Sequence, residues 1–193
     1  MYYVLKYICR LISLLIFRVH ITGRENIPTE GAFLVAANHL SILDPVIISF
    51  ITPRPIHFMA KAELFRTKFT KWLFGSVKTI KVERGANDIS AIKKSLTVLK
   101  KGEILGLFPE GTRTKGKNSD VTVKSGAIML AHRAKVKILP VAIRSDYKLF
   151  SKVEVRILPL FDPEVYLIDT SDYDQAANHL LETIYEGVEQ TLK

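Results

Sequence analysis

The sequence contains a single cysteine, Cys9, and lacks a long hydrophobic run at its N-terminus. One cysteine cannot form an internal disulfide, which fits a reducing compartment. The longest charge-free run near the N-terminus, residues 11–17, falls far short of the roughly 20 apolar residues that a transmembrane helix needs. The same segment has no small-residue cleavage site of the signal-peptide type. It is therefore predicted neither to cross a bilayer nor to be a cleaved leader.

Several common functional motifs are also missing from the chain. There is no GxSxG nucleophile elbow, no GxxxxGK[ST] phosphate loop, no HExxH helix and no CxxC pair. These absences argue against a serine hydrolase, a Walker-type nucleotide site and a zinc site. Without these zinc motifs, no metal is expected. No RNA-binding signature, zinc finger or helix-turn-helix is recognisable either, so nucleic acid is not an expected partner.

The composition indicates one basic globular domain. Of 193 residues, 48% are hydrophobic, and 28 Lys plus Arg against 19 Asp plus Glu give a net charge of +9. The charge is uneven, because residues 162–193 hold eight acids and one base. The body of the chain should therefore attract an anionic partner such as a phosphate ligand or a lipid surface.

Two segments have the composition of membrane-interface helices. In residues 1–18, Lys6, Arg10 and Arg18 recur at helical spacing among Leu, Ile, Phe and Tyr. This pattern predicts an amphipathic helix in the interface with snorkelling cations, whose charged ends stay in water, or alternatively an ordinary core-packing helix. Residues 61–84 mix cations with aromatic side chains, which suits a bilayer interface, single-stranded nucleic acid or a charged face over a core. We expect residues 1–18 to form the interfacial helix and residues 19–193 the domain.

The rest of the chain alternates predicted strands with predicted helices. The strands are expected at residues 19–23, 33–37, 56–60, 77–84, 103–108, 136–143 and 152–161. The helices are expected at residues 44–51, 61–76, 88–100, 124–134 and from 172 onward. Such alternation predicts a single α/β domain with a mostly parallel central sheet flanked by helices.

The stretch NHLSILDP, residues 38–45, places His39 and Asp44 five positions apart. On a continuous helix the two side chains would point roughly 140° apart, so His39 is expected in a turn that folds its imidazole onto the carboxylate. Asp44-Pro45 is a typical helix start, in which Asp44 would accept bonds from first-turn amides. A carboxylate-held histidine can act as a general base. Because no enzyme nucleophile is recognisable, it would act on a substrate hydroxyl; the alternative is a helix cap beside a structural histidine.

A second candidate is the polar loop FPEGTRTKGK, residues 108–117, which follows a predicted strand. Glycines permit close backbone approach, and arginine can hold phosphate oxygens through two hydrogen bonds. Loops at the ends of parallel strands are where α/β sheets bind ligands. The loop therefore suggests a phosphate site, or alternatively an ordinary solvated surface loop.

Four blocks in order, within about residues 20–145, resemble the glycerolipid acyltransferase family, above all its 1-acyl-sn-glycerol-3-phosphate acyltransferases. The blocks are NHLSILD with His39 and Asp44, GSVKTIKVER with Gly75 and Arg84, FPEGTR with Glu110 to Arg113, and ILPVAI with Pro140.

The resemblance implies transfer of an acyl group from coenzyme A or acyl carrier protein to the sn-2 hydroxyl of lysophosphatidic acid, giving phosphatidic acid for phospholipid synthesis. His39 would be the base and Asp44 its orienting partner, without any cofactor besides the thioester co-substrate. The residues implied to bind the acceptor are Lys61, Arg84, Glu110, Gly111, Thr112 and Arg113.

Both acceptor and product are membrane lipids, so the chain is expected at the cytoplasmic face of the cell membrane, as a peripheral or monotopic protein on an anionic surface. One alternative is a sister enzyme acting on glycerol 3-phosphate or another lysolipid. A basic, non-catalytic module that binds nucleic acid or membrane is the other.

Overall fold

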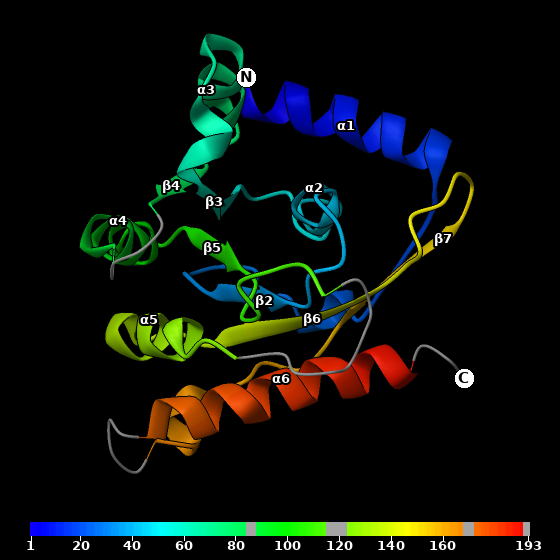
Figure 1. The fold of residues 1–193 in the computed structure, drawn as a ribbon. Coiled ribbons are helices and arrows are strands. Elements are labelled where there is room, and N and C mark those ends of the chain that lie inside the picture. Colours follow the sequence, from blue (N-terminus) through cyan, green and yellow to red (C-terminus); the bar gives the residue numbers. More distant parts are fainter. Residues whose placement is uncertain (84–87, 115–122, 168–171, 191–193) are drawn as a thin grey trace.

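A seven-stranded sheet runs through the centre of the computed structural model, which describes residues 1–83, 88–114, 123–167 and 172–190 (Figure 1). The strand order is β1-β7-β6-β2-β5-β3-β4. The strands are β1 (Arg18–Thr22), β2 (Leu34–Ala37), β3 (Ile56–Lys61), β4 (Ile80–Val82), β5 (Ile104–Leu107), β6 (Ile138–Arg144) and β7 (Lys152–Ile157).

The sheet is parallel except at one pair, β6 with β7, which is antiparallel. At its centre Val35 of β2 aligns with Leu139 of β6 on one side and with Gly106 of β5 on the other. A Cβ at Gly106 would lie 2.5 Å from the ring of Phe58, so this close packing requires glycine. The predicted α/β class with a mostly parallel sheet is confirmed.

Six α-helices occur among the described residues, on both sides of the sheet (Figure 1). The helices α1 (Tyr2–Ile16) and α2 (Asp44–Ile48) lie over one face, and α3 (Lys68–Ser76) stands beyond β3 and β4 beside the N-terminus. The other face is covered by α4 (Ile89–Lys100), α5 (Gly126–Ala134) and α6 (Tyr173–Gln190).

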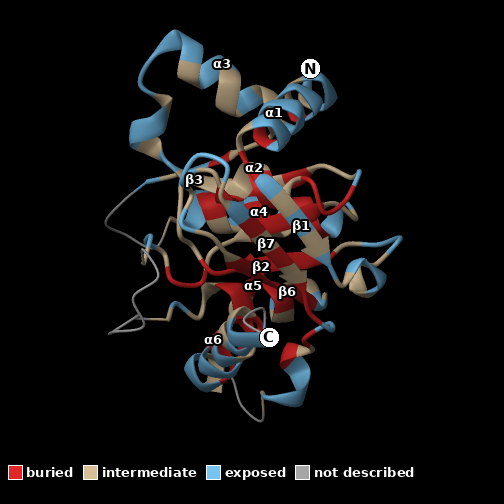
Figure 2. Ribbon diagram, turned by 90° about the vertical axis from the view of Figure 1, so that its right-hand side faces the viewer, coloured by how far each residue is buried: buried red, intermediate tan, exposed pale blue. Residues whose placement is uncertain are grey.

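The central strand β2 is fully buried because each of its faces packs into a hydrophobic core. Val35 and Ala37 belong to the core beneath α2, whereas Leu34 and Ala36 belong to the core beneath α4, α5 and α6. A strand buried on both faces must be apolar throughout, which explains the uninterrupted apolar run of this segment. The buried interior is visible as the central band in Figure 2.

The predicted single helix over residues 61–76 is wrong. Strand β3 extends through Lys61, a short 3₁₀ turn follows at Ala62–Phe65, and α3 begins only at Lys68. Thr67 and Thr70 each accept a hydrogen bond from the other's backbone N–H, a capping box that starts a new helix.

Helix α1 spans Tyr2–Ile16, and most of its residues are exposed (Figure 2), apolar ones included. Only Lys6 and Ser13 of this helix are buried. The Lys6 ammonium donates to the Thr52 carbonyl at 2.5 Å inside the protein, so the expectation that Lys6 snorkels into water is wrong. Burial, and secondarily the charge of Arg10, lowers the pKa of Lys6 to about 8. The exposed apolar residues of α1 are Tyr3, Val4, Tyr7, Ile8, Leu11, Ile12, Leu14 and Leu15.

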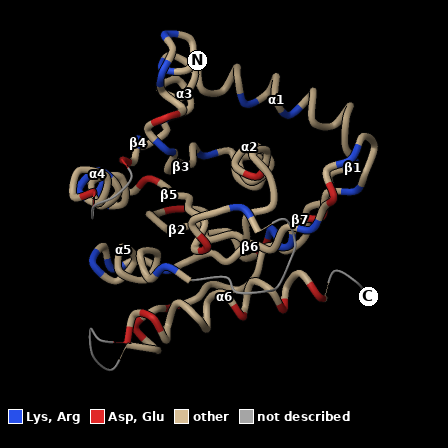
Figure 3. Tube along the Cα trace, viewed as in Figure 1, with Lys and Arg blue, Asp and Glu red and all other residues tan. Residues whose placement is uncertain are grey.

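The charges also separate in space. Figure 3 shows acidic positions along α6, across the sheet from basic positions on α1 and α3. No helix among the described residues has both the length and the hydrophobicity of a membrane span.

Candidate active site

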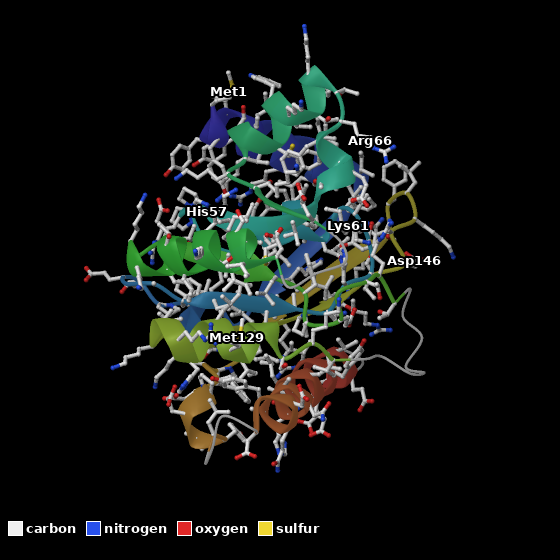
Figure 4. All side chains as sticks on the ribbon, turned by 60° about the vertical axis from the view of Figure 1, so that its left-hand side comes forward. Met1, His57, Lys61, Arg66, Met129 and Asp146 are labelled. Carbon is white, nitrogen blue, oxygen red and sulfur yellow. The ribbon has the colours of Figure 1, made fainter. Side chains whose placement is uncertain are left out.

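The predicted functional segments meet at one edge of the sheet, which we call the carboxyl edge. It is formed by the carboxyl ends of β2, β5, β3 and β6, which all run in the same direction. His39 follows β2, the loop beginning at Phe108 follows β5, and Lys61 ends β3. Figure 4 shows Lys61 and His57 at opposite ends of β3. Open α/β sheets bind their ligands at this edge.

The turn after β2 brings the His39 imidazole onto the Asp44 carboxylate, as predicted. His39 Nδ1 lies 2.8 Å from Asp44 Oδ2, and the same oxygen accepts from the backbone N–H groups of Leu40 at 2.6 Å and Ser41 at 2.7 Å. Asp44 is 0% exposed, whereas the His39 side chain is 18% exposed. The turn therefore hides the acid and leaves the imidazole accessible.

Asp44 begins α2, but its side chain does not cap that helix. The expectation that it accepts from first-turn amides is wrong, because its oxygens are taken by groups outside the helix. Oδ2 faces back to the turn, and Oδ1 accepts from the Tyr147 hydroxyl at 2.5 Å. Pro45 still occupies a first-turn position, where its missing N–H costs nothing.

Tyr147 is a site residue that the sequence motifs did not indicate. It lies 103 positions from Asp44, in the segment between β6 and β7. Burial and the negative charge of Asp44 raise the pKa of the Tyr147 hydroxyl above its ordinary value, so the phenol stays protonated and donates.

The orientation of the His39 imidazole leaves one ring nitrogen, Nε2, able to accept a proton. Because a carboxylate can only accept, the contact with Asp44 places a proton on His39 Nδ1 and leaves Nε2 as the basic nitrogen. One face of the ring stacks on Phe108, with centroids 4.0 Å apart and planes 15° apart. Phe108 in turn stacks on Phe58. The ring is thus fixed both by its hydrogen bond and by aromatic packing.

The backbone of His39 is held by the polar loop after β5. Glu110 accepts from the His39 N–H at 3.1 Å and from the Tyr185 hydroxyl of α6 at 2.7 Å. Thr114 donates its N–H to the His39 carbonyl at 2.9 Å. Burial raises the pKa of Glu110, and burial together with Glu110 raises the pKa of Tyr185 to about 12. Tyr185 is a second residue that no sequence motif indicated.

The remaining predicted residues of this loop lie around a tight turn. Gly111 has a φ of +65°, and a Cβ there would lie 2.9 Å from the Lys124 side chain, so the position favours glycine. Thr112 and Arg113 are exposed, as is Lys61 on the neighbouring strand β3. Arg84, which follows β4, lies outside the described residues, as do Lys115 and Lys117.

The sequence matches the family model described as Acyltransferase over residues 18–144, and the chain belongs to this family. It is 34% identical over 144 residues to the 1-acyl-sn-glycerol-3-phosphate acyltransferase of Bacillus subtilis, covering 72% of this chain and 71% of that protein. It is 29% identical over 169 residues to the enzyme of the same name from Borreliella burgdorferi, covering 82% of this chain and 66% of that protein.

The fold also has a solved counterpart. The crystal structure of the 1-acyl-sn-glycerophosphate acyltransferase PlsC from Thermotoga maritima is similar with a TM-score of 0.77 and 28% identity. The similarity covers 98% of this chain and 80% of that one, so it includes the segments after residue 144.

Proposed function

We propose that this protein transfers an acyl group from a thioester, on coenzyme A or acyl carrier protein, to the sn-2 hydroxyl of 1-acyl-sn-glycerol-3-phosphate, yielding phosphatidic acid. The observation that carries the proposal is the hydrogen bond between His39 Nδ1 and buried Asp44, which leaves Nε2 as a base beside a loop bearing Arg113. The names of the bacterial relatives support the choice of acceptor.

In the proposed reaction, His39 Nε2 accepts the proton of the sn-2 hydroxyl while the oxygen attacks the thioester carbonyl carbon. Asp44 stabilises the resulting imidazolium through Nδ1. The tetrahedral intermediate then expels the thiolate, the C–S bond breaks, and the imidazolium returns its proton to the sulfur. A thioester is already activated, so a positioned base suffices, and such a base typically contributes about 10²–10⁴-fold.

The acceptor phosphate is assigned to the cations of the carboxyl edge. Arg113 and Lys61 are exposed there, and Arg84 is included from the family motif. Glu110 has a different role in this proposal, because it is 3% exposed and its carboxylate already accepts from the His39 N–H and from Tyr185. We therefore assign Glu110 to positioning His39, and the turn at Gly111 to directing Arg113 toward the phosphate.

The outward apolar side of α1 is assigned to the membrane interface. Phe69 and Trp72 of α3 are also exposed, and Trp is favoured at the lipid headgroup level. Basic residues near an anionic leaflet add about 1 kcal/mol each. This arrangement supports a peripheral or monotopic enzyme at the cytoplasmic face of the cell membrane that draws its lipid acceptor from the leaflet.

The activity is tested with purified protein in anionic vesicles, offering acyl-coenzyme A or acyl-acyl carrier protein with lysophosphatidic acid, glycerol 3-phosphate or another lysolipid. Thiol release and lipid products are measured together. The proposal expects phosphatidic acid as the main product, with one donor preferred. A preference for glycerol 3-phosphate or another lysolipid would reassign the acceptor, and no thiol release with any pair would reject the proposal.

The membrane assignment is tested by vesicle flotation of a variant with Ile8→Asp and Leu11→Asp, two changes on the exposed side of α1. We expect the variant to float with vesicles at least about tenfold less efficiently, because burying two carboxylates at the interface is unfavourable. The matched control, Val165→Asp, changes an exposed apolar residue on the α6 side of the sheet. Equal flotation of the α1 variant and the wild type would reject the assignment.

A further inference from the structure

The segment between β6 and β7 carries Tyr147, whose hydroxyl bonds to the buried carboxylate of Asp44. Tyr147 donates to Asp44 Oδ1 at 2.5 Å, whereas Asp44 Oδ2 faces His39. This tyrosine lies after residue 144, where the match to the family model ends. The contact therefore joins an acid inside the matched segment to a residue outside it.

The backbone around Tyr147 is built to hold it in one conformation. Tyr147 has a φ of +52°, a left-handed conformation that non-glycine residues adopt only when surrounding contacts enforce it. Its N–H donates to Ser145 Oγ at 2.9 Å, and that hydroxyl donates to the Lys152 carbonyl at 3.0 Å. The ring packs edge-on against Phe17, with centroids 5.7 Å apart.

The same segment is tied to the end of α1. Phe150 donates its N–H to the Ile16 carbonyl at 2.7 Å, so the chain around Tyr147 is anchored on both sides. An anchored phenol loses little further freedom when it bonds to the carboxylate, which makes the contact with Asp44 specific in direction.

A fully buried carboxylate must be satisfied by several donors and is sensitive to the loss of any one. Asp44 accepts on Oδ2 from the imidazole and from the amides of Leu40 and Ser41, and on Oδ1 from Tyr147. The three donors on Oδ2 all come from the turn that also carries His39. Tyr147 approaches from the segment between β6 and β7 and bonds the other carboxylate oxygen, Oδ1.

We infer that Tyr147 is a positioning residue for acyl transfer: it orients the Asp44 carboxylate so that Oδ2 holds His39 Nδ1 throughout proton transfer. The inference rests on the proposed function.

The test is Tyr147→Phe, which keeps the ring against Phe17 and removes only the hydroxyl. We expect kcat to fall about tenfold, the effect of losing one hydrogen bond to a charged group in the transition state. The KM values for lysophosphatidic acid and for the acyl thioester should stay within about twofold, since the Tyr147 hydroxyl acts on Asp44 rather than on substrate in this proposal. The pH profile of kcat/KM should differ from that of the wild type, because the His39 imidazole is no longer held in one orientation.

The matched control is Tyr166→Phe, which removes a hydroxyl from a partly exposed tyrosine stacked on Phe161, outside the site. It should keep the wild-type kcat and pH profile. Rates are compared per folded molecule, using circular dichroism and the ¹⁵N signals of the His39 ring. A shift of those ring signals in Tyr147→Phe alone would support a positioning role.

Two outcomes would overturn the inference. One is a wild-type kcat and pH profile in Tyr147→Phe. The other is a fall in activity that disappears after correction for the folded fraction, with the pH profile and His39 ring signals unchanged, which would make the tyrosine merely structural. If His39→Ala is inactive in the same assay, either outcome leaves the proposed function standing. If His39→Ala retains full activity, the proposed function itself fails.

Discussion

The two edges of the sheet each carry a histidine beside a carboxylate, and the two pairs differ in almost every physical respect. At the carboxyl edge His39 makes a hydrogen bond of 2.8 Å to Asp44, which is 0% exposed. At the opposite edge, His57 Nε2 lies 3.2 Å from Glu103 Oε2 without the geometry of a hydrogen bond, and Glu103 is 37% exposed. A histidine near an acid therefore does not by itself have the geometry that the proposed base requires.

The difference lies in what surrounds each carboxylate. Asp44 is fixed by two backbone amides and by Tyr147, whereas Glu103 also lies near the exposed Lys78 ammonium, at 3.5 Å. An exposed ion pair is screened by water and contributes little. A buried, fully hydrogen-bonded acid can hold an imidazole in one tautomer and orientation, as general-base catalysis requires.

The sharpest way to break this comparison is to remove each imidazole in turn. We expect His39→Ala to lower kcat by about 10²–10⁴-fold, because the base is lost. His57→Gln should keep kcat within about threefold, since surface and structural positions rarely affect transition-state binding. Thiol release from the acyl thioester measures both. A comparable loss in the two variants would show that the two edges do not differ in function.

Replacing the two carboxylates should also lower kcat more at the carboxyl edge than at the opposite edge, but by a smaller factor than replacing the two histidines. In Asp44→Asn the amide can donate to His39 Nδ1 and favour the tautomer that lacks a basic Nε2, so we expect kcat to fall on the order of 10²-fold. Glu103→Gln, the equivalent change at the other edge, should alter kcat by less than about twofold. The comparison would fail if Asp44→Asn kept full activity in the presence of an intact fold.

The cations at the two edges should differ in the binding of the acceptor. Arg113→Ala is expected to raise the KM for lysophosphatidic acid about tenfold, because one charge-assisted bond to phosphate is lost. The KM for the acyl donor should stay unchanged. Lys101→Ala removes an exposed cation at the opposite edge, and its acceptor KM should match the wild type. Equal acceptor KM values in all three proteins would remove the phosphate assignment.

The sequence predicted the features that depend on local pattern. The apolar run of β2 marked a buried strand, and the spacing of His39 and Asp44 excluded a continuous helix and indicated the turn that pairs them. The loop after β5 was expected at the ligand-binding edge because parallel strands end on the same side. These features could be predicted because each is set by residues close together in the chain.

Contacts between distant residues could not be predicted in the same way. Tyr147 and Tyr185 lie 103 and 75 positions from the acids that they contact, and neither belongs to a motif. The inward direction of Lys6 depends on the carbonyl of Thr52, which only the packing of α1 on α2 brings near. The break before α3 depends on Thr67 and Thr70, whose reciprocal bonds override a helical pattern that continues on both sides.

The smallest expected difference concerns the pH dependence of stability. Burial, partly offset by Glu103, lowers the pKa of His57 in the folded protein. The unfolded chain, with an ordinary value of about 6.5, then binds a proton more readily than the folded chain as pH falls. Above a pH of about 6.5, His57 does not change the free energy of unfolding. As the pH falls from there toward the lowered pKa that His57 has in the folded protein, His57 lowers the free energy of unfolding.

Removing His57 should flatten this part of the stability profile. Urea unfolding of His57→Gln between about pH 7.5 and 5 should show a smaller loss in the free energy of unfolding than the wild type shows. The control is His20→Gln, which changes an exposed residue of β1 and should keep the wild-type slope. Identical slopes for His57→Gln and the wild type would mean that burial of His57 at the opposite edge does not suppress its protonation.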